Sequence, residues 1–132
     1  MRAANSEMWT KIILIAVAGM AGTLSRYWVS GLTYDIMGSK FAYGTLMVNV
    51  LGCLIFGAVW AFAEEKMIAS TLVRTVLLVG FLGAFTTFST FAFETMNYIR
   101  DSQYLTAFAN VALNCVLGFS AIIAGVWLVR TL

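Results

Sequence analysis

Four long stretches of apolar residues follow one another along the chain, separated by short polar segments. They cover approximately residues 9–32, 41–63, 71–98 and 104–129. A helix needs about 20 mostly apolar residues to cross the hydrocarbon core of a bilayer, and each stretch reaches that length. The pattern predicts an all-α integral membrane protein with four transmembrane helices, organised as a single domain over residues 1–132. The short connections place consecutive helices antiparallel.

The third stretch differs from the others because its centre is rich in glycine and hydroxyl residues. Residues 80–91 read Gly-Phe-Leu-Gly-Ala-Phe-Thr-Thr-Phe-Ser-Thr-Phe, and the chain has no proline that would otherwise kink a helix. Glycine has low helix propensity, and hydroxyl side chains compete for backbone carbonyls. Unwound backbone at membrane depth persists only where protein, water or an ion satisfies it. We therefore expect the third helix to be broken in mid-membrane, with an unwound turn between Gly83 and Thr86. A kinked but continuous helix is the alternative.

Polar and small residues in the other stretches recur at helical spacing. In the first, Ala18 and Gly22 form a small-residue pair that lets another helix approach closely. Arg26 follows on the same face, either as an anchor that reaches the membrane surface or as an interior cation that draws anions. Asn49 lies near the middle of the second stretch, where it is either helix–helix glue or a functional group. The fourth stretch carries a polar stripe, which favours a hydrated track: Thr106, Asn110, Asn114 and Gly118.

Aromatic rings alternate with hydroxyl groups in the second half of the third stretch. Phe85, Phe88 and Phe91 recur every three residues. The edge of an aromatic ring carries the positive end of its quadrupole, so it can face an anion. Glu94 follows one turn later, and an ionisable residue inside a span is a functional candidate by default. Pairing of Glu94 with Arg26 is the structural alternative.

Composition narrows the classes of function. Hydrophobic residues make up 61% of the 132 residues and charged residues 11%, which excludes an ordinary soluble domain. The absence of histidine excludes imidazole metal sites, haem ligation and histidine base chemistry, so we do not expect an enzyme. Cys53 and Cys115 lie in apolar stretches and are better explained as small hydrophobic residues than as a redox pair. The net charge of +2 gives no reason to expect a nucleic-acid partner.

The distribution of basic residues fixes orientation only weakly. Five lie on the amino-terminal side of the predicted membrane: Arg2, Lys11, Lys66, Arg74 and Arg130. Three lie on the other side: Arg26, Lys40 and Arg100. If the mature chain began at Met8, the count would be four against three. So small a bias permits insertion in both orientations, which would supply the two halves of an antiparallel homodimer.

Three segments together resemble the Fluc (CrcB) family of fluoride channels, and the resemblance covers essentially the whole chain. They are Gly-x-x-Ser-Arg-Tyr ending at Tyr27, Gly-Thr-Leu-Met-Val-Asn-Val-Leu-Gly over residues 44–52, and the run 80–91 followed by Glu94. The resemblance implies a fluoride-selective channel in a membrane of the bacterial inner-membrane type. It also implies a dual-topology antiparallel homodimer, embedded in lipid, with two pores built from both chains.

The resemblance also assigns roles to individual residues. It implies a fluoride path lined by Asn49, Phe88, Ser89, Thr90 and Phe91. Asn110 and Asn114 match the family's fourth-span track by residue type, standing where relatives carry a tyrosine or small hydroxyl residues. Further residues match other parts of the family pattern: Gly83 and Thr86 as backbone ligands of a structural sodium ion at the dimer centre, and Arg26 and Glu94 as electrostatic residues.

Two other functions fit the size and charge of the chain. One is a proton-coupled exporter of the small four-span, dual-topology kind, with Glu94 as the exchanging carboxylate. Against it, Glu94 lies behind a run of phenylalanine and hydroxyl residues, and the interior offers several neutral hydrogen-bond donors. The other is a purely structural membrane subunit, which predicts that purified protein carries no ion flux.

Overall fold

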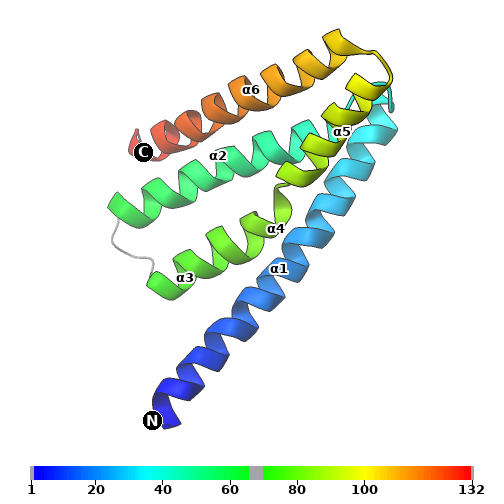
Figure 1. The fold of residues 1–132 in the computed structure, drawn as a ribbon. Helices are drawn as coiled ribbons and strands as arrows, with labels where there is room; N and C mark the ends of the chain where they lie inside the picture. Colours follow the sequence, from blue (N-terminus) through cyan, green and yellow to red (C-terminus); the bar gives the residue numbers. More distant parts are fainter. Residues whose placement is uncertain (1, 66–69, 132) are drawn as a thin grey trace.

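A computed structural model describes residues 2–65 and 70–131, which are helical almost throughout. Lys66, which we counted toward orientation, lies outside the described residues. Figure 1 shows the order of the elements, which are α1 (Arg2–Met37), α2 (Tyr43–Glu65), α3 (Thr71–Thr75), the π-helical segment η1 (Val76–Leu82), α4 (Gly83–Phe85), α5 (Phe88–Arg100) and α6 (Tyr104–Arg130).

Four helical stretches are long and apolar enough to cross a membrane, which confirms the predicted number of spans. By length and composition they are Asn5–Met37, Tyr43–Glu64, Thr71–Arg100 and Tyr104–Arg130. The second to fourth lie within a few residues of the predicted limits. The protein is therefore an all-helical, multi-pass membrane protein.

The first helix is longer than the predicted span 9–32 and extends beyond it at both ends. Polar residues beyond residue 32 lower the hydropathy of the chain, but they do not break helical hydrogen bonding, so the helix continues. Thr33, for example, donates from Oγ1 to the Val29 carbonyl of the same helix at 2.6 Å. Gly38 ends it by adopting φ +80, and its N–H donates to the Tyr34 carbonyl at 2.8 Å. At about 1.5 Å per residue, α1 is longer than the roughly 30 Å hydrocarbon core. Its amino-terminal turns extend past the rest of the bundle (Figure 1).

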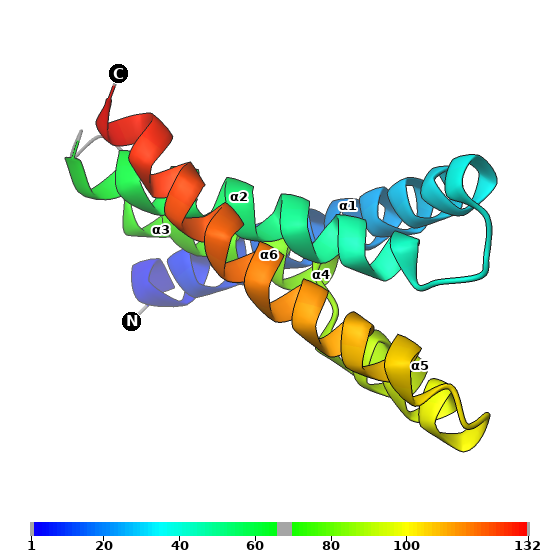
Figure 2. The ribbon, with the colours of Figure 1, turned by 90° about the horizontal axis from the view of Figure 1, so that it is seen from above.

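The most extensive contact in the bundle joins α2 and α6, which cross side by side in Figures 1 and 2. Two glycines make this close crossing possible. A Cβ atom on Gly57 would overlap the Ile122 carbonyl, and one on Gly125 would overlap the Leu54 carbonyl. The two backbones therefore touch directly, as small residues allow in membrane helix pairs.

Small residues also join α1 to the third span. A Cβ on Gly22 would overlap the Phe81 carbonyl, and one on Gly80 would lie 2.9 Å from the Ala18 Cβ. This confirms the predicted close approach at Ala18 and Gly22. Behind the contact lies a buried apolar cluster that joins α2, η1 and α4: Val48, Leu78, Leu82 and Phe85. The carboxyl-terminal end of α4 is thus held firmly from two sides.

The glycine contacts between α2 and α6 generate a stability prediction. We expect Gly125→Ala to lower the free energy of unfolding by about 1–3 kcal/mol, because the new methyl group must push the Leu54 carbonyl away. Gly31→Ala is the matched control, since a Cβ there meets no atom within 4 Å. Thermal unfolding of both variants in detergent, followed by intrinsic fluorescence, measures the difference. Equal melting temperatures would contradict the proposed backbone contact.

Candidate functional site

Two extended residues separate α4 from α5, and we call them the junction (residues 86 and 87). Thr86 has φ −82 and ψ 159, and Thr87 has φ −148 and ψ 113. Thr87 also caps α5, because its Oγ1 accepts from the Thr90 N–H at 3.2 Å. The expected start of the unwound turn at Gly83 was wrong. Gly83 has helical angles of φ −62 and ψ −31, and helical bonding continues until Thr86 N–H donates to the Leu82 carbonyl.

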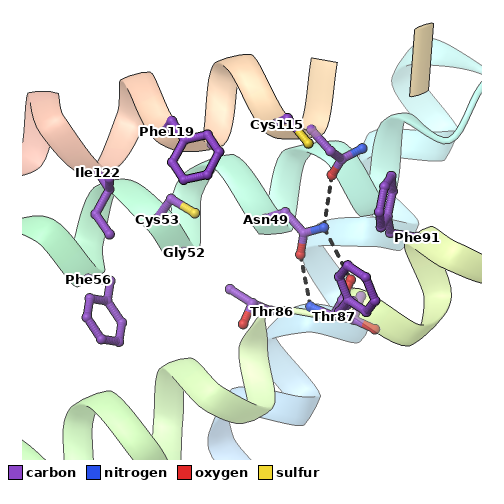
Figure 3. Close-up of a pocket in the computed structure, with 13 residues that line it drawn as sticks. Asn49, Gly52, Cys53, Phe56, Thr86, Thr87, Phe91, Cys115, Phe119 and Ile122 are labelled. Atoms are coloured by element: carbon purple, nitrogen blue, oxygen red, sulfur yellow. Dashed lines mark hydrogen bonds between the residues drawn. The ribbon is translucent and has the colours of Figure 1, made fainter. Parts of the chain in front are cut away.

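Asn49 of α2 supplies the hydrogen bonds that the junction lacks from its own helix. Its Oδ1 accepts from the Thr87 N–H at 2.9 Å, and its Nδ2 donates to the Thr87 carbonyl at 3.2 Å. Figure 3 shows both bonds running from Asn49 to Thr87. The amide thus pairs with both polar groups of one residue, as a neighbouring strand would. Nδ2 also donates to Asn114 Oδ1 at 3.0 Å, which ties α6 to the same point.

A chain of hydrogen bonds continues from Asn114 to α5. Asn114 Nδ2 lies 3.0 Å from the Asn110 carbonyl and 3.1 Å from Asn110 Oδ1. Asn110 is fully buried, and its Nδ2 donates to Thr95 Oγ1 at 2.9 Å. Thr95 Oγ1 in turn donates to the Phe91 carbonyl at 2.8 Å. Two residues of the polar stripe thus form hydrogen bonds to other helices, Asn110 to α5 and Asn114 to α2.

A cavity of about 420 Å³ lies beside the junction, and Figure 3 shows its lining. Asn49 and Asn114 border it, together with Phe88 and Phe91. The two rings are tilted by 59° with their centroids 5.5 Å apart, and Phe88 is 78% exposed. Most of the remaining wall is apolar and comes from α2 and α6. The cavity thus brings together four of the predicted fluoride-path residues.

The two free cysteines, Cys53 and Cys115, also line this cavity.

The predicted hydroxyl residues and Arg26 lie around the start of α5. Thr87 Oγ1 donates to Thr90 Oγ1 at 2.9 Å and lies 3.4 Å from Ser89 Oγ. Thr90 borders a second cavity, of about 750 Å³, together with Arg26. Arg26 Nη1 donates to the Thr86 carbonyl at 3.5 Å, so the guanidinium group faces the junction.

Glu94 binds a different set of partners. Its Oε1 accepts from Thr45 Oγ1 at 2.7 Å and from Tyr34 OH at 3.2 Å. The pairing of Glu94 with Arg26 that we weighed is therefore not formed. Glu94 borders a third cavity, of about 330 Å³, near the ends of α1 and α5.

Three residues that organise these sites were not singled out as site residues from the sequence. Thr87 was one hydroxyl residue among several in the run 80–91, and nothing in the run distinguished it as the cap of α5. Thr45 lies one helical turn before Asn49 on α2, so its spacing placed it on the polar face. No signal pointed to Tyr34, because it lay outside the predicted first span.

Comparison with known proteins adds a family to this geometry. The sequence profile of the family described as "CrcB-like protein, Camphor Resistance (CrcB)" matches residues 13–126. A protein named "Fluoride-specific ion channel FluC" from Solidesulfovibrio magneticus is 52% identical over 123 residues, covering 93% of this chain and 98% of the relative. Its namesake from Nitrosococcus oceani is 48% identical over 118 residues, covering 89% and 94% respectively. The namesake from Desulforapulum autotrophicum is 43% identical over 120 residues, covering 91% and 96%.

The hydrogen bonds of Asn49 predict a large structural role for this side chain. Asn49→Ala leaves both polar groups of Thr87 without their partner, at a cost of about 1–3 kcal/mol for each group. Asn114→Ala is the comparison, because it removes one bond of Asn49 and spares both bonds to Thr87. We expect the Asn49 variant to unfold at the lower temperature in detergent. A wild-type melting temperature for Asn49→Ala would show that the junction does not depend on this amide.

Proposed function

This chain belongs to the CrcB family, and from that membership and the cavity we propose that it is a fluoride-specific ion channel that lets fluoride leave the cytoplasm passively. Its relatives in three bacteria carry that name. The observation that carries the proposal is the meeting of two distant motifs at one cavity. Asn49 belongs to the motif at residues 44–52. Phe88 and Phe91 belong to the run at residues 80–91, where they follow the junction.

The chemistry of the cavity suits a small anion. Fluoride holds its water tightly, so a selective path must replace that water with closely placed donors. Neutral donors and weakly positive ring edges do so without holding the ion as firmly as a fixed cation would, which permits exit as well as entry. Asn49 donates an Nδ2 hydrogen to Asn114 Oδ1. An entering anion would compete with Asn114 for this hydrogen.

Fixed positive charge lies apart from this cavity. Arg26 borders the second cavity and is engaged with the Thr86 carbonyl. Its charge can raise the potential around the junction without trapping an anion between Phe88 and Phe91. We assign Arg26 this electrostatic role, and we assign Ser89 and Thr90 the role of hydroxyl donors at the start of α5.

We propose that two chains assemble as an antiparallel homodimer. The nearly balanced basic residues permit both orientations. Phe88 is 78% exposed although it borders the cavity, so a single chain leaves one wall of that space incomplete. A second copy would complete the wall and cover part of the apolar surface, which otherwise faces lipid.

The junction is proposed to break the third span in mid-membrane and to hold a sodium ion at the dimer centre. Residues 86 and 87 fall close to the middle of the span Thr71–Arg100. The Thr87 N–H, which an unbroken helix would offer to the Gly83 carbonyl, is bound to Asn49 instead. The Thr86 carbonyl has a second lone pair beside its contact with Arg26. Both carbonyls therefore suit a cation, which would be structural.

Selective flux is the first expected result. Purified protein in liposomes should release fluoride down its gradient, with chloride release at the level of protein-free liposomes. Phe88→Ala should slow fluoride release by about two- to tenfold, the loss that corresponds to one aromatic contact of this kind. Phe93→Ala is the matched control, because Phe93 is exposed on the same helix but does not border the cavity among the described residues.

Two outcomes of this assay would overturn the channel. Equal release of chloride and fluoride would refute selectivity. Strict one-for-one exchange with protons, abolished by Glu94→Gln, would establish the proton-coupled exporter in its place.

The sodium ion has its own test. Replacing sodium by N-methyl-D-glucamine should lower both the fluoride flux and the fraction of dimer on size-exclusion chromatography, because the carbonyls at the junction lose their counter-charge. Restoring sodium should recover both. If neither quantity changes in the absence of alkali cations, the central ion has no support.

A further inference from the structure

Glu94 is the one carboxylate on α5, and it borders the third cavity, not the one that Phe88 and Phe91 border. The cavity of about 330 Å³ lies where α1, the start of α2 and the end of α5 meet. Other oxygen-bearing side chains line the same cavity: Tyr34, Ser39, Asn97 and Tyr98.

The two oxygens of Glu94 differ sharply in their surroundings. Oε1 accepts two hydrogen bonds, from Thr45 and Tyr34. Oε2 is buried and has no hydrogen-bond partner among the described residues. A buried oxygen of an ionised group without a partner is strongly destabilising, so a partner for Oε2 is expected from outside the chain's described side chains.

Three described basic residues are relevant to the charge of Glu94, and none forms an ion pair with it: Arg26, Lys40 and Arg100. Lys40 is exposed and follows Ser39 of the cavity lining. Arg26 donates to the Thr86 carbonyl, and Arg100 lies 3.7 Å from Asp101 at the exposed end of α5. Neither guanidinium group therefore balances Glu94. The charge of the carboxylate is left to a small cation that enters through the cavity.

We propose that Glu94 Oε2 binds a monovalent alkali cation of the sodium type in this cavity, with hydroxyl and amide oxygens of the lining completing its shell. Oxygen ligands suit a hard cation. One carboxylate matches a single positive charge, and among the described residues no group of three or more acidic, cysteine or histidine side chains is available to hold a divalent or transition metal. The site is separate from the backbone carbonyls at the junction.

The consequence for conduction rests on the proposed function. Glu94 follows Phe88 by six residues on α5, a rise of about 9 Å along the helix. An uncompensated carboxylate at that distance repels an anion beside the rings. A bound cation removes this repulsion, so an anion-conducting protein gains from a cation held at Glu94.

Labelling with dicyclohexylcarbodiimide tests the site directly, because the reagent modifies membrane-embedded carboxyl groups. Mass spectrometry then identifies the modified residue. The full chain in detergent is labelled in sodium chloride and in N-methyl-D-glucamine chloride at equal ionic strength. Bound sodium should slow labelling of Glu94 by about tenfold when its concentration is about ten times the dissociation constant. Tyr98→Phe, which removes one lining oxygen but keeps the ring, should shift protection to higher sodium concentration.

The outcomes separate this site from the other proposals. Equal labelling of Glu94 in both buffers would show that a proton, not a cation, occupies Oε2, and would overturn the proposal. If Glu94 is labelled in neither buffer, the proposal is also overturned, because a cavity open to sodium must leave Glu94 accessible when sodium is removed. Protection that is unchanged in Tyr98→Phe and Tyr34→Phe would place the ion elsewhere. Fluoride release from liposomes, measured in parallel, reports separately on the channel itself.

Discussion

Hydrogen bonding of backbone in a medium without water is the constraint on which this protein depends. A continuous helix satisfies its own N–H and carbonyl groups, whereas the extended residue Thr87 does not. Asn49 resolves the conflict at Thr87 by accepting from its N–H and donating to its carbonyl. The position of α2 beside the junction follows from this need. The crossing of α2 and α6 at Gly57 and Gly125 then brings Asn114 within reach of the same amide.

Charge and neutral polarity are separated around this point. Neutral amides and aromatic rings border the first cavity, while Arg26 and Glu94 border two others. The separation is physically sensible for a path that must release an anion as readily as it accepts one. Charged groups act through the local potential at a distance, and neutral groups make the close contacts. Arg26 is held by the neutral Thr86 carbonyl, and the proposed cation would offset the charge of Glu94.

The sequence predicted the parts of this structure that depend on composition and periodicity. Four apolar stretches predicted four spans, and the pair Ala18 and Gly22 predicted a close helix contact, because both follow from local spacing. The helix α1 continues past the predicted end of the first span, since hydropathy falls before helical bonding stops at Gly38. The unwound turn was expected to begin at Gly83. Packing on both sides of α4 keeps that residue helical despite the low helix propensity of glycine. The partners of Asn49 and Glu94 come from elements distant in sequence, and a single sequence read alone does not reveal such pairs.

Asn49 has one further consequence, because the same amide holds the backbone and borders the cavity. A substitution that changes which ions the cavity accepts at this position also changes the shape of the helix that carries Phe88 and Phe91. Selectivity and architecture are therefore not independent traits at residue 49. Evolution toward a different ion would have to begin at neighbouring wall positions, such as those of α6, and alter residue 49 only after a compensating donor for Thr87 had appeared. The order of mutations, as much as their identity, would decide which descendants of this chain remain folded.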